Sequence, residues 1–316
     1  MLKLVLSALS LKTFQITQQL WVSRQKQYNN MVPDFILGGA MKSGTTFLHN
    51  LLENHPQVKI IDRNMDHAYF DDDRIYPRGK EWYMSLFNGV MKDKEQGKII
   101  GQTSADCNFN PGSVKRIIEH NPDTKLIFVL RHPIERSYSL YWHQYSMGRE
   151  YRKFEDAIKM EPKLIKKSYH HFKHYSYLER SRYYQQFEEI AKLLPSQNLL
   201  ILDFDSLVKN TLPSINIVLE FLGADKVNDL KELNYEVLRR NPAKIPTNHT
   251  VVLISAALHK LGLIRVSRRI LNMFRKEMRP PKIDDAMQAK LEQELKNDIA
   301  FFDKVKKDFH AKINQN

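Results

Sequence analysis

The hydrophobic pattern along the chain predicts five short strands that are buried on both faces. Continuous apolar runs bounded by glycine, proline or charged residues are typical of such strands. They fall at 35–38, 58–61, 98–101, 125–130 and 199–202. Between these runs, apolar residues recur at helical spacing, so strands and helices alternate. This alternation predicts an α/β fold with three layers, a central parallel sheet flanked by helices, and a ligand beyond the carboxyl ends of the strands.

The remaining helical patterns indicate how the chain is divided. They predict a helical insertion at about 141–195 and further helices at 211–224 and 284–312. Residues 1–32 read as an N-terminal arm or helix, and residues 33–316 as one domain. With 316 residues and 42% hydrophobic content, the chain can bury a large core in a single domain.

A glycine-rich turn follows the first predicted strand. The strand runs through Gly39 into Lys42-Ser43-Gly44-Thr45-Thr46, and apolar residues at helical spacing come next. Glycine lets backbone N–H groups approach an oxyanion, the helix N-terminus adds a partial positive charge, and Lys42 adds a full one. The sequence therefore predicts that this turn binds a phosphate or sulfate ester.

The position of the lysine distinguishes this turn from the common nucleotide-binding loop, G-x-x-x-x-G-K-[ST]. Gly39 and Gly44 have the spacing of that loop, but Thr45 follows the second glycine and the lysine lies inside the turn at Lys42. The fold is therefore P-loop-like. Lys42 instead projects from the turn itself. We expect it to point toward the terminal group of the bound ligand, where a group leaves or arrives.

A second segment indicates which anion is bound. The strand pattern at 125–130 ends in Arg131, where a nucleoside triphosphatase would need a carboxylate to hold its metal, directly or through water. Arginine binds anions and repels Mg²⁺. The sequence therefore favours an anion site that uses no metal.

Together, Lys42-Ser43-Gly44-Thr45-Thr46 and Leu130-Arg131-His132-Pro133 resemble the sulfotransferases that use 3′-phosphoadenosine 5′-phosphosulfate (PAPS). The most similar branch contains bacterial sulfotransferases and the heparan-sulfate-type carbohydrate enzymes. The resemblance implies that the first loop holds the 5′-phosphosulfate, with Lys42 acting on the transfer itself. It implies that Arg131 and Ser139, eight residues further on, hold the 3′-phosphate. On a late loop, it implies three more candidate nucleotide contacts: Arg239, Arg240 and Lys244.

The resemblance also implies where the acceptor binds. The general base of carbohydrate sulfotransferases is a glutamate, and Asp66 falls on its position with His67 as an adjacent rival. Either side chain could accept a hydroxyl proton. The loop after the third strand offers Thr103, Ser104 and Asp106 as acceptor contacts.

The charge balance fits this interpretation. Lys and Arg total 49 against 36 Asp and Glu, a formal net charge of +13. This excess suits an anionic nucleotide and an acidic carbohydrate acceptor. The basic residues are spread along the chain without a nucleic-acid module signature, so we do not expect nucleic-acid binding. The basic stretch from Lys260 to Arg279 is a candidate for peripheral membrane contact.

Cys107 is the only cysteine, so an internal disulfide is excluded. No apolar run has the roughly 18 residues that a membrane-spanning helix needs. From these features we expect a cytoplasmic protein. Two rival functions use the same loop: a phosphotransferase or nucleoside triphosphatase, which would depend on Mg²⁺ and bind ATP, and a non-enzymatic nucleotide- or polyanion-binding module, which would bind without turnover.

Overall fold

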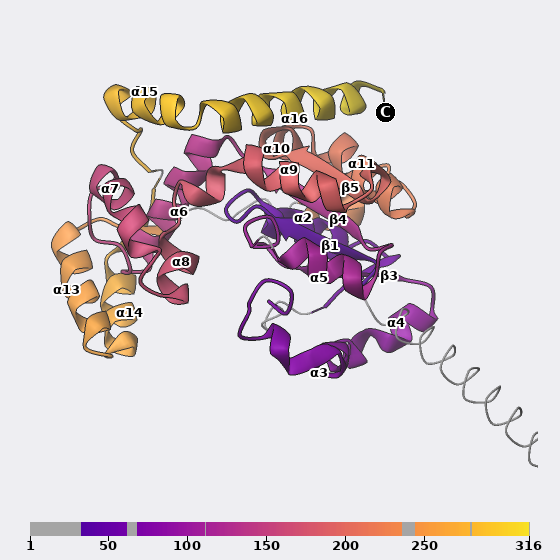
Figure 1. The fold of residues 1–316 in the computed structure, drawn as a ribbon, viewed down its shortest axis with the longest axis horizontal. Coiled ribbons are helices and arrows are strands. Elements are labelled where there is room, and N and C mark those ends of the chain that lie inside the picture. The colour runs from indigo at the N-terminus through magenta and orange to yellow at the C-terminus, as the bar shows by residue number, and fades with distance from the viewer. Residues whose placement is uncertain (1–32, 62–67, 111, 236–243, 279, 316) are drawn as a thin grey trace, which may run out of the picture.

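The computed structural model describes residues 33–61, 68–110, 112–235, 244–278 and 280–315. Its centre is a parallel sheet of five strands in the order β2-β3-β1-β4-β5 (Figure 1). The strands are β1 Phe35–Gly39, β2 Val58–Ile60, β3 Ile99–Thr103, β4 Lys125–Leu130 and β5 Leu199–Asp203. Each lies within a residue or two of a predicted strand. The predicted three-layer, P-loop-like α/β fold is confirmed.

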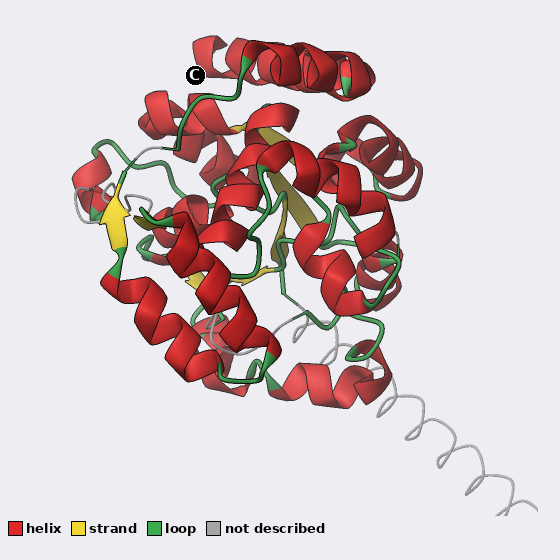
Figure 2. Cartoon of the chain, turned by 90° about the vertical axis from the view of Figure 1, so that its left-hand side faces the viewer, coloured by secondary structure: helices red, strands yellow, loops and turns green. Residues whose placement is uncertain are grey.

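Helices connect the strands and cover both faces of the sheet (Figures 1 and 2). The α-helices are α2 Thr45–Glu53, α3 Gly79–Ser85, α4 Met91–Glu95, α5 Ser113–His120, α6 Pro133–Ser146, α7 Phe154–Leu164, α8 Tyr169–Tyr175, α9 Tyr183–Leu193, α10 Phe204–Lys209, α11 Thr211–Leu222, α13 His249–Lys260, α14 Ile264–Met273, α15 Asp285–Glu294 and α16 Lys296–Gln315. The 3₁₀ helices are η1 Tyr76–Arg78, η2 Asn88–Val90, η3 Glu179–Ser181, η4 Ser196–Asn198 and η5 Leu230–Leu233. A separate antiparallel pair joins β6 Lys244–Pro246 to β7 Arg275–Glu277.

Several of these helices fall where helical patterns were predicted. Helices α7 to α9 lie within the stretch at about 141–195, α11 covers most of 211–224, and α15 with α16 covers 284–312. The predicted arm at 1–32 lies outside the described residues. The assignment of 33–316 to one domain stays a prediction.

Alternating side chains of the strands build two cores, one on each face of the sheet. Ile36 of β1 joins a core with Phe128 of β4, whereas its neighbours Phe35 and Leu37 join the opposite core with Val129. A strand buried on both sides needs apolar residues at every position, which is why the sequence shows continuous apolar runs. A third core lies among α6, α7, α13, α14 and α15.

The strand order brings particular loops together at one edge of the sheet. Strand β1 lies between β3 and β4, so the chain runs to one side of β1 to form β2 and β3 and to the other side to form β4 and β5. Because all five strands are parallel, the loops that follow β1, β3, β4 and β5 meet at the carboxyl edge. A ligand of an open α/β sheet binds at such a point, where the direction of strand addition reverses.

Candidate active site

The turn after β1 has a backbone that only certain residues tolerate. Gly44 has a φ of 91°, and a Cβ atom added there would lie 2.6 Å from the Phe204 ring. Glycine is therefore required at this position. Lys42 also lies in the left-handed region, with a φ of 71°. A non-glycine residue in this region costs on the order of 1–3 kcal/mol, and such strain clusters at ligand sites.

Helix α2 begins directly after this turn, as the sequence predicts. The amide of Phe47 donates to the Gly44 carbonyl at 2.9 Å, and the amide of Ser43 donates to the Ala40 carbonyl at 3.1 Å. The side chains of Ser43 and Thr45 are buried, and Thr46 is exposed. The first amides of an α-helix have no partner within the helix, so this end of α2 can receive an anion.

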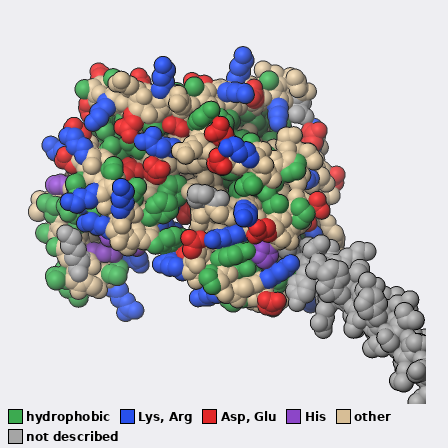
Figure 3. Space-filling view, viewed as in Figure 1, with side chains coloured by type: hydrophobic (Ala, Val, Ile, Leu, Met, Phe, Trp, Pro, Cys, Tyr) green, Lys and Arg blue, Asp and Glu red, His purple; other side chains and the backbone are tan. Residues whose placement is uncertain are grey.

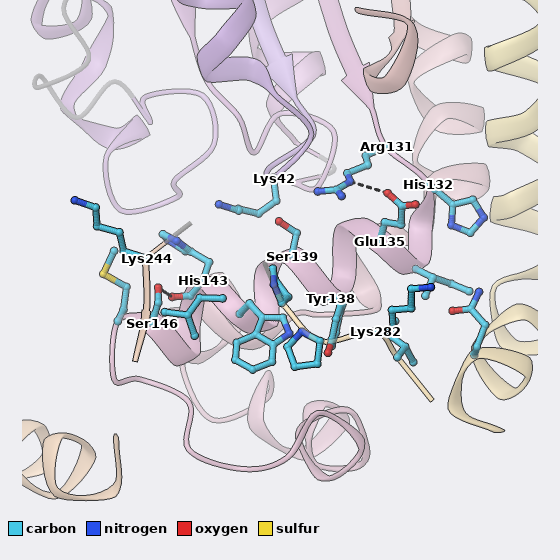
Figure 4. A pocket seen from close by; sticks show the side chains of 18 of the residues that line it. Lys42, Arg131, His132, Glu135, Tyr138, Ser139, His143, Ser146, Lys244 and Lys282 are labelled. Carbon is cyan, nitrogen blue, oxygen red and sulfur yellow. Dashed lines mark hydrogen bonds and ion pairs between the residues drawn. The ribbon is translucent and has the colours of Figure 1, made fainter. Parts of the chain in front are cut away.

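Lys42 extends from the turn into a cavity (Figure 4). Burial lowers the pKa of its ammonium group, and the nearby positive charge of Arg131 lowers it further. Both effects disfavour the charged form of Lys42. An anion between Lys42 and Arg131 would offset the repulsion and raise the pKa of Lys42.

Arg131 and Ser139 face the same cavity as Lys42 (Figure 4). Arg131 is the first residue after β4, and its Nε lies 3.1 Å from a carboxylate oxygen of Glu135. Its guanidinium carbon lies 5.2 Å from the centre of the Phe204 ring. Ser139 lies further along α6. The structure therefore brings together three of the predicted nucleotide contacts, which come from two separate parts of the sequence.

The cavity has a volume of about 1220 Å³ and a strongly positive lining. Its only lining carboxylate among the described residues is Glu135, which already pairs with Arg131. Such a lining favours a ligand with several negative charges. The basic side chains that line it are Lys42, Arg131, Lys244, Arg275 and Lys282.

His143 is a cavity residue that the sequence analysis did not single out. It lies four residues after Ser139 on α6 and faces the cavity below Lys42 (Figure 4). Burial lowers the pKa of its imidazole to about 4, with further lowering from the positive charges of Lys42, Arg149 and Arg275. The ring is therefore neutral at pH 7 and can accept a proton or a hydrogen bond. The i, i+4 spacing from Ser139 was the signal that could have identified it.

The three predicted acceptor contacts have partners inside the fold. The Thr103 hydroxyl lies 2.8 Å from His49 Nδ1, and the Ser104 hydroxyl donates to the buried carboxylate of Asp71. Asp106 pairs with Arg180 at 2.6 Å. These residues do not line the cavity described above.

For Asp106, burial alone would raise the pKa of the carboxyl group, but the Arg180 charge outweighs burial and the pKa is lowered. Asp106 is thus held as a carboxylate by an ion pair. The role of these three residues in acceptor binding stays a prediction.

Four other predicted site residues lie outside the described residues: Asp66, His67, Arg239 and Arg240. Lys244, the third candidate of the late loop, is described and lines the cavity. Within the described ranges, no group of three or more His, Cys, Asp or Glu side chains is arranged to hold a metal ion.

Comparison with known proteins assigns a family to this fold and site. The sulfotransferase domain family model matches residues 32–292, so the chain belongs to that family. The chain is 38% identical over 110 residues to the membrane-associated sulfotransferase kil1 of Dictyostelium discoideum, covering 35% of this chain and 22% of that protein. It is 28% identical over 197 residues to heparan sulfate glucosamine 3-O-sulfotransferase 5 of Mus musculus, covering 61% and 54% of the two chains. The matches thus span about half or less of these relatives.

Among solved structures, the fold is similar to a sulfotransferase from Alicyclobacillus acidocaldarius. The TM-score is 0.54 at 23% sequence identity, covering 74% of this chain and 96% of the other. This likeness concerns the fold. In the part of the chain that the structure describes, no helix has the length and apolar character needed to cross a membrane.

The neutral state of His143 makes stability depend on pH. In the unfolded chain its pKa is near the ordinary 6.5, and in the folded protein it is about 4. Between these values the unfolded state binds more protons, so this group lowers stability as the pH falls from about 6.5 to about 4. We expect His143→Gln to show a smaller loss of melting temperature than the wild type between pH 7 and about 4.5, measured by thermal unfolding. Parallel curves for the two proteins would contradict the assignment.

Proposed function

We propose that this protein is a PAPS-dependent sulfotransferase that transfers a sulfuryl group to a hydroxyl of a carbohydrate or glycoconjugate, with an amine as the other possible acceptor group. The observation that carries the proposal is the meeting of Lys42, Arg131 and Ser139 around one cavity with a positive lining. The chain's family supports it. The arginine at the end of β4 disfavours the rival phosphotransferase, which would need a carboxylate there for its metal.

In this proposal the two ends of the nucleotide bind to different elements. The first turn of α2 and the hydroxyls near Gly44 hold the 5′-phosphosulfate. Arg131 and Ser139 hold the 3′-phosphate, since a guanidinium and a hydroxyl on neighbouring elements can share its oxygens. On the late segment, Lys244 already lines the cavity, and the same role is proposed for Arg239 and Arg240.

The chemical step is an in-line displacement at sulfur. The acceptor oxygen forms a bond to sulfur while the bond between sulfur and the bridging oxygen of the 5′-phosphate breaks. Negative charge grows on that bridging oxygen, so a cation near it stabilises the transition state more than the ground state. Lys42 is the residue proposed for this role. The acceptor proton passes to a general base, Asp66 by its position in the sequence or His67 beside it.

Support for a base in the segment 62–67 comes from the residues on either side. The amide of Ile61, after β2, donates to the Gly101 carbonyl of β3 at 3.0 Å. On the other side, Asp71 is buried and accepts hydrogen bonds from Ser104 and Cys107. Burial raises the pKa of Asp71 to about 6. Both flanks are thus fixed at the carboxyl edge of the sheet, the edge from which Lys42 projects.

A carbohydrate acceptor is supported by the names of several relatives. They include heparan sulfate glucosamine 3-O-sulfotransferase 5 and a bifunctional heparan sulfate N-deacetylase/N-sulfotransferase from Caenorhabditis briggsae. The positive lining of the cavity suits an acidic sugar as well as the nucleotide. A cytoplasmic location is also proposed, because the only cysteine, Cys107, is a buried free thiol and the fold needs no disulfide.

The first test concerns nucleotide preference. Adenosine 3′,5′-bisphosphate should raise the melting temperature far more than AMP, since only the bisphosphate has the 3′-phosphate for Arg131 and Ser139. Arg131→Ala should weaken bisphosphate binding by about tenfold or more, because a hydrogen bond to a charged group contributes roughly 1.5–3 kcal/mol. Isothermal titration calorimetry measures this change.

A matched control is Arg182→Ala. Arg182 is also a partly exposed arginine in surface ion pairs, with Glu179 at 3.3 Å and Glu294 at 3.2 Å, and it does not line the cavity. Its removal should leave bisphosphate affinity unchanged. Equal thermal shifts from AMP and the bisphosphate would contradict the PAPS proposal.

The second test separates chemistry from binding at Lys42. Lys42→Ala should lower kcat by roughly a hundredfold or more, the order of magnitude for losing one transition-state donor. Affinity for the bisphosphate should fall much less, because Arg131 and the α2 terminus remain. Single-turnover kinetics and calorimetry give the two quantities. Equal losses in both would assign Lys42 to ground-state binding instead.

The third test concerns the base. Asp66→Asn keeps nearly the same shape but cannot accept the proton, so it should remove most of the activity and leave bisphosphate affinity intact. His67→Asn should have a milder effect in the same assay of sulfate transfer. The opposite order would give the role to His67. If both variants stay active, the base lies elsewhere, and the neutral His143 of the cavity becomes the next candidate.

A further inference from the structure

The helical hairpin of α13 and α14 has an outward surface that differs from the rest of the molecule. In α13, Val251 and Val252 are buried in the third core, whereas Leu253 and Ile254 are 43% and 48% exposed. A surface helix of a globular protein is normally polar on its outward face. Helix α13 is instead apolar on its inward and its outward faces.

Exposed apolar side chains concentrate in this one region. Among the described residues, nine of the twelve large hydrophobic side chains with high exposure lie between Leu253 and Met278. Leu261, at the turn between the two helices, is 74% exposed, and Met273, at the end of α14, is 73% exposed. Single exposed hydrophobic residues need no explanation, but a gathered set of this size marks an interaction surface.

The same region is strongly basic. From residue 244 to residue 282 the sequence has nine Lys and Arg but only one acidic residue, Glu277. Helix α14 buries Ser267 and Leu271, and its outward face carries three exposed arginines. Figure 3 shows hydrophobic side chains beside Lys and Arg at the lower left, where Figure 1 places α13 and α14. These arginines are Arg265, Arg268 and Arg269.

Apolar side chains next to cations match the two layers of an anionic membrane surface. Hydrophobic side chains enter the boundary of the acyl chains, while Lys and Arg contact the phosphates of the headgroups. Helix α13 has 12 residues. At 1.5 Å per residue it is about 18 Å long. It is thus shorter than the roughly 30 Å hydrocarbon core, and the geometry suits a helix that lies along the surface.

We propose that the α13–α14 hairpin docks this protein onto an anionic lipid surface. The apolar side chains Leu253, Ile254 and Leu261 enter the acyl boundary. The guanidinium groups of Arg265, Arg268 and Arg269 bind lipid phosphates. A protein partner would need an apolar surface against α13 and acidic groups opposite these arginines, in one fixed arrangement. An anionic bilayer offers both an apolar interior and negative headgroups over its whole area.

Docking would also orient the active-site cavity. The hairpin is closed at its base by β6 and β7, and Lys244, Ile245 and Arg275 from these strands line the cavity. A docked protein therefore holds the cavity close to the lipid. This inference rests on the proposed sulfotransferase function: a cavity held close to the lipid favours an acceptor carried by a lipid, such as a glycolipid, over an acceptor free in solution. Docking itself requires no enzymatic activity.

The test is flotation of the full chain with vesicles, without PAPS or acceptor. One set of vesicles contains phosphatidylcholine alone, and the other contains about one-third phosphatidylglycerol, enough to give the surface a negative potential. We expect binding to the anionic vesicles only, and a loss of binding as salt is raised.

Two variants test the hairpin directly. Leu261→Glu and the double variant Arg265→Glu, Arg269→Glu should each lower the fraction bound by about tenfold. Leu193→Glu is the matched control, because Leu193 is 42% exposed at the end of α9, away from the hairpin, and it should bind vesicles like the wild type. Thermal unfolding of each variant verifies that it is folded, and adenosine 3′,5′-bisphosphate binding, measured in parallel, tests the proposed function separately.

Three outcomes would overturn the proposal. Absence of binding to anionic vesicles would exclude lipid docking. Equal binding by wild type and both hairpin variants would place the contact on another part of the chain. A dimer seen by light scattering without lipid, and lost in Leu261→Glu, would identify the hairpin as an interface between two copies if vesicle binding is also absent.

Discussion

The site depends on two cations, Lys42 and Arg131, that the fold holds around one cavity at the carboxyl edge of the sheet. Burial and the charge of Arg131 both lower the Lys42 pKa. The backbone adds to this cost, since Lys42 occupies a left-handed conformation that lysine rarely adopts. A polyanion in the cavity would stabilise both cations, so this arrangement favours a phosphate- or sulfate-rich ligand. The same arrangement directs Lys42 into the cavity, where we propose that it acts on the transferred group.

The rest of the fold keeps these cations in place. The Phe204 ring, at the start of α10, lies close to both Gly44 and the Arg131 guanidinium, so the segments after β1, β4 and β5 meet at one contact. Glu135 fixes Arg131 from α6. A second set of buried polar contacts fixes the opposite loops. Asp71 accepts from Ser104, and Asp106 pairs with Arg180 at 2.6 Å. Both the Arg131 region and the loop after β3 are therefore held by side-chain contacts.

The late part of the chain completes the cavity and extends its surroundings. Lys244 and Arg275 come from β6 and β7, which pair with each other and not with the central sheet. The segment between them forms the hairpin with its apolar and basic surface. The segment from β6 to β7 thus supplies one wall of the cavity and also carries the hairpin surface that we propose binds lipid.

Local sequence patterns predicted the strands and the P-loop-like turn, and the resemblance to PAPS-dependent sulfotransferases suggested roles for Lys42, Arg131 and Ser139. These features depend on local patterns: apolar runs, glycine spacing and a charged residue at a strand end. Phe204 and Arg275 became apparent only in the folded protein, because packing between elements distant in the chain brings them to Gly44 and to the cavity. His143 lies one helical turn after Ser139, so its spacing was visible in the sequence. Likewise, Thr103, Ser104 and Asp106 are visible in sequence as polar loop residues, but their partners His49, Asp71 and Arg180 are set by folding. Local patterns encode which groups are available, and long-range packing decides which of them meet.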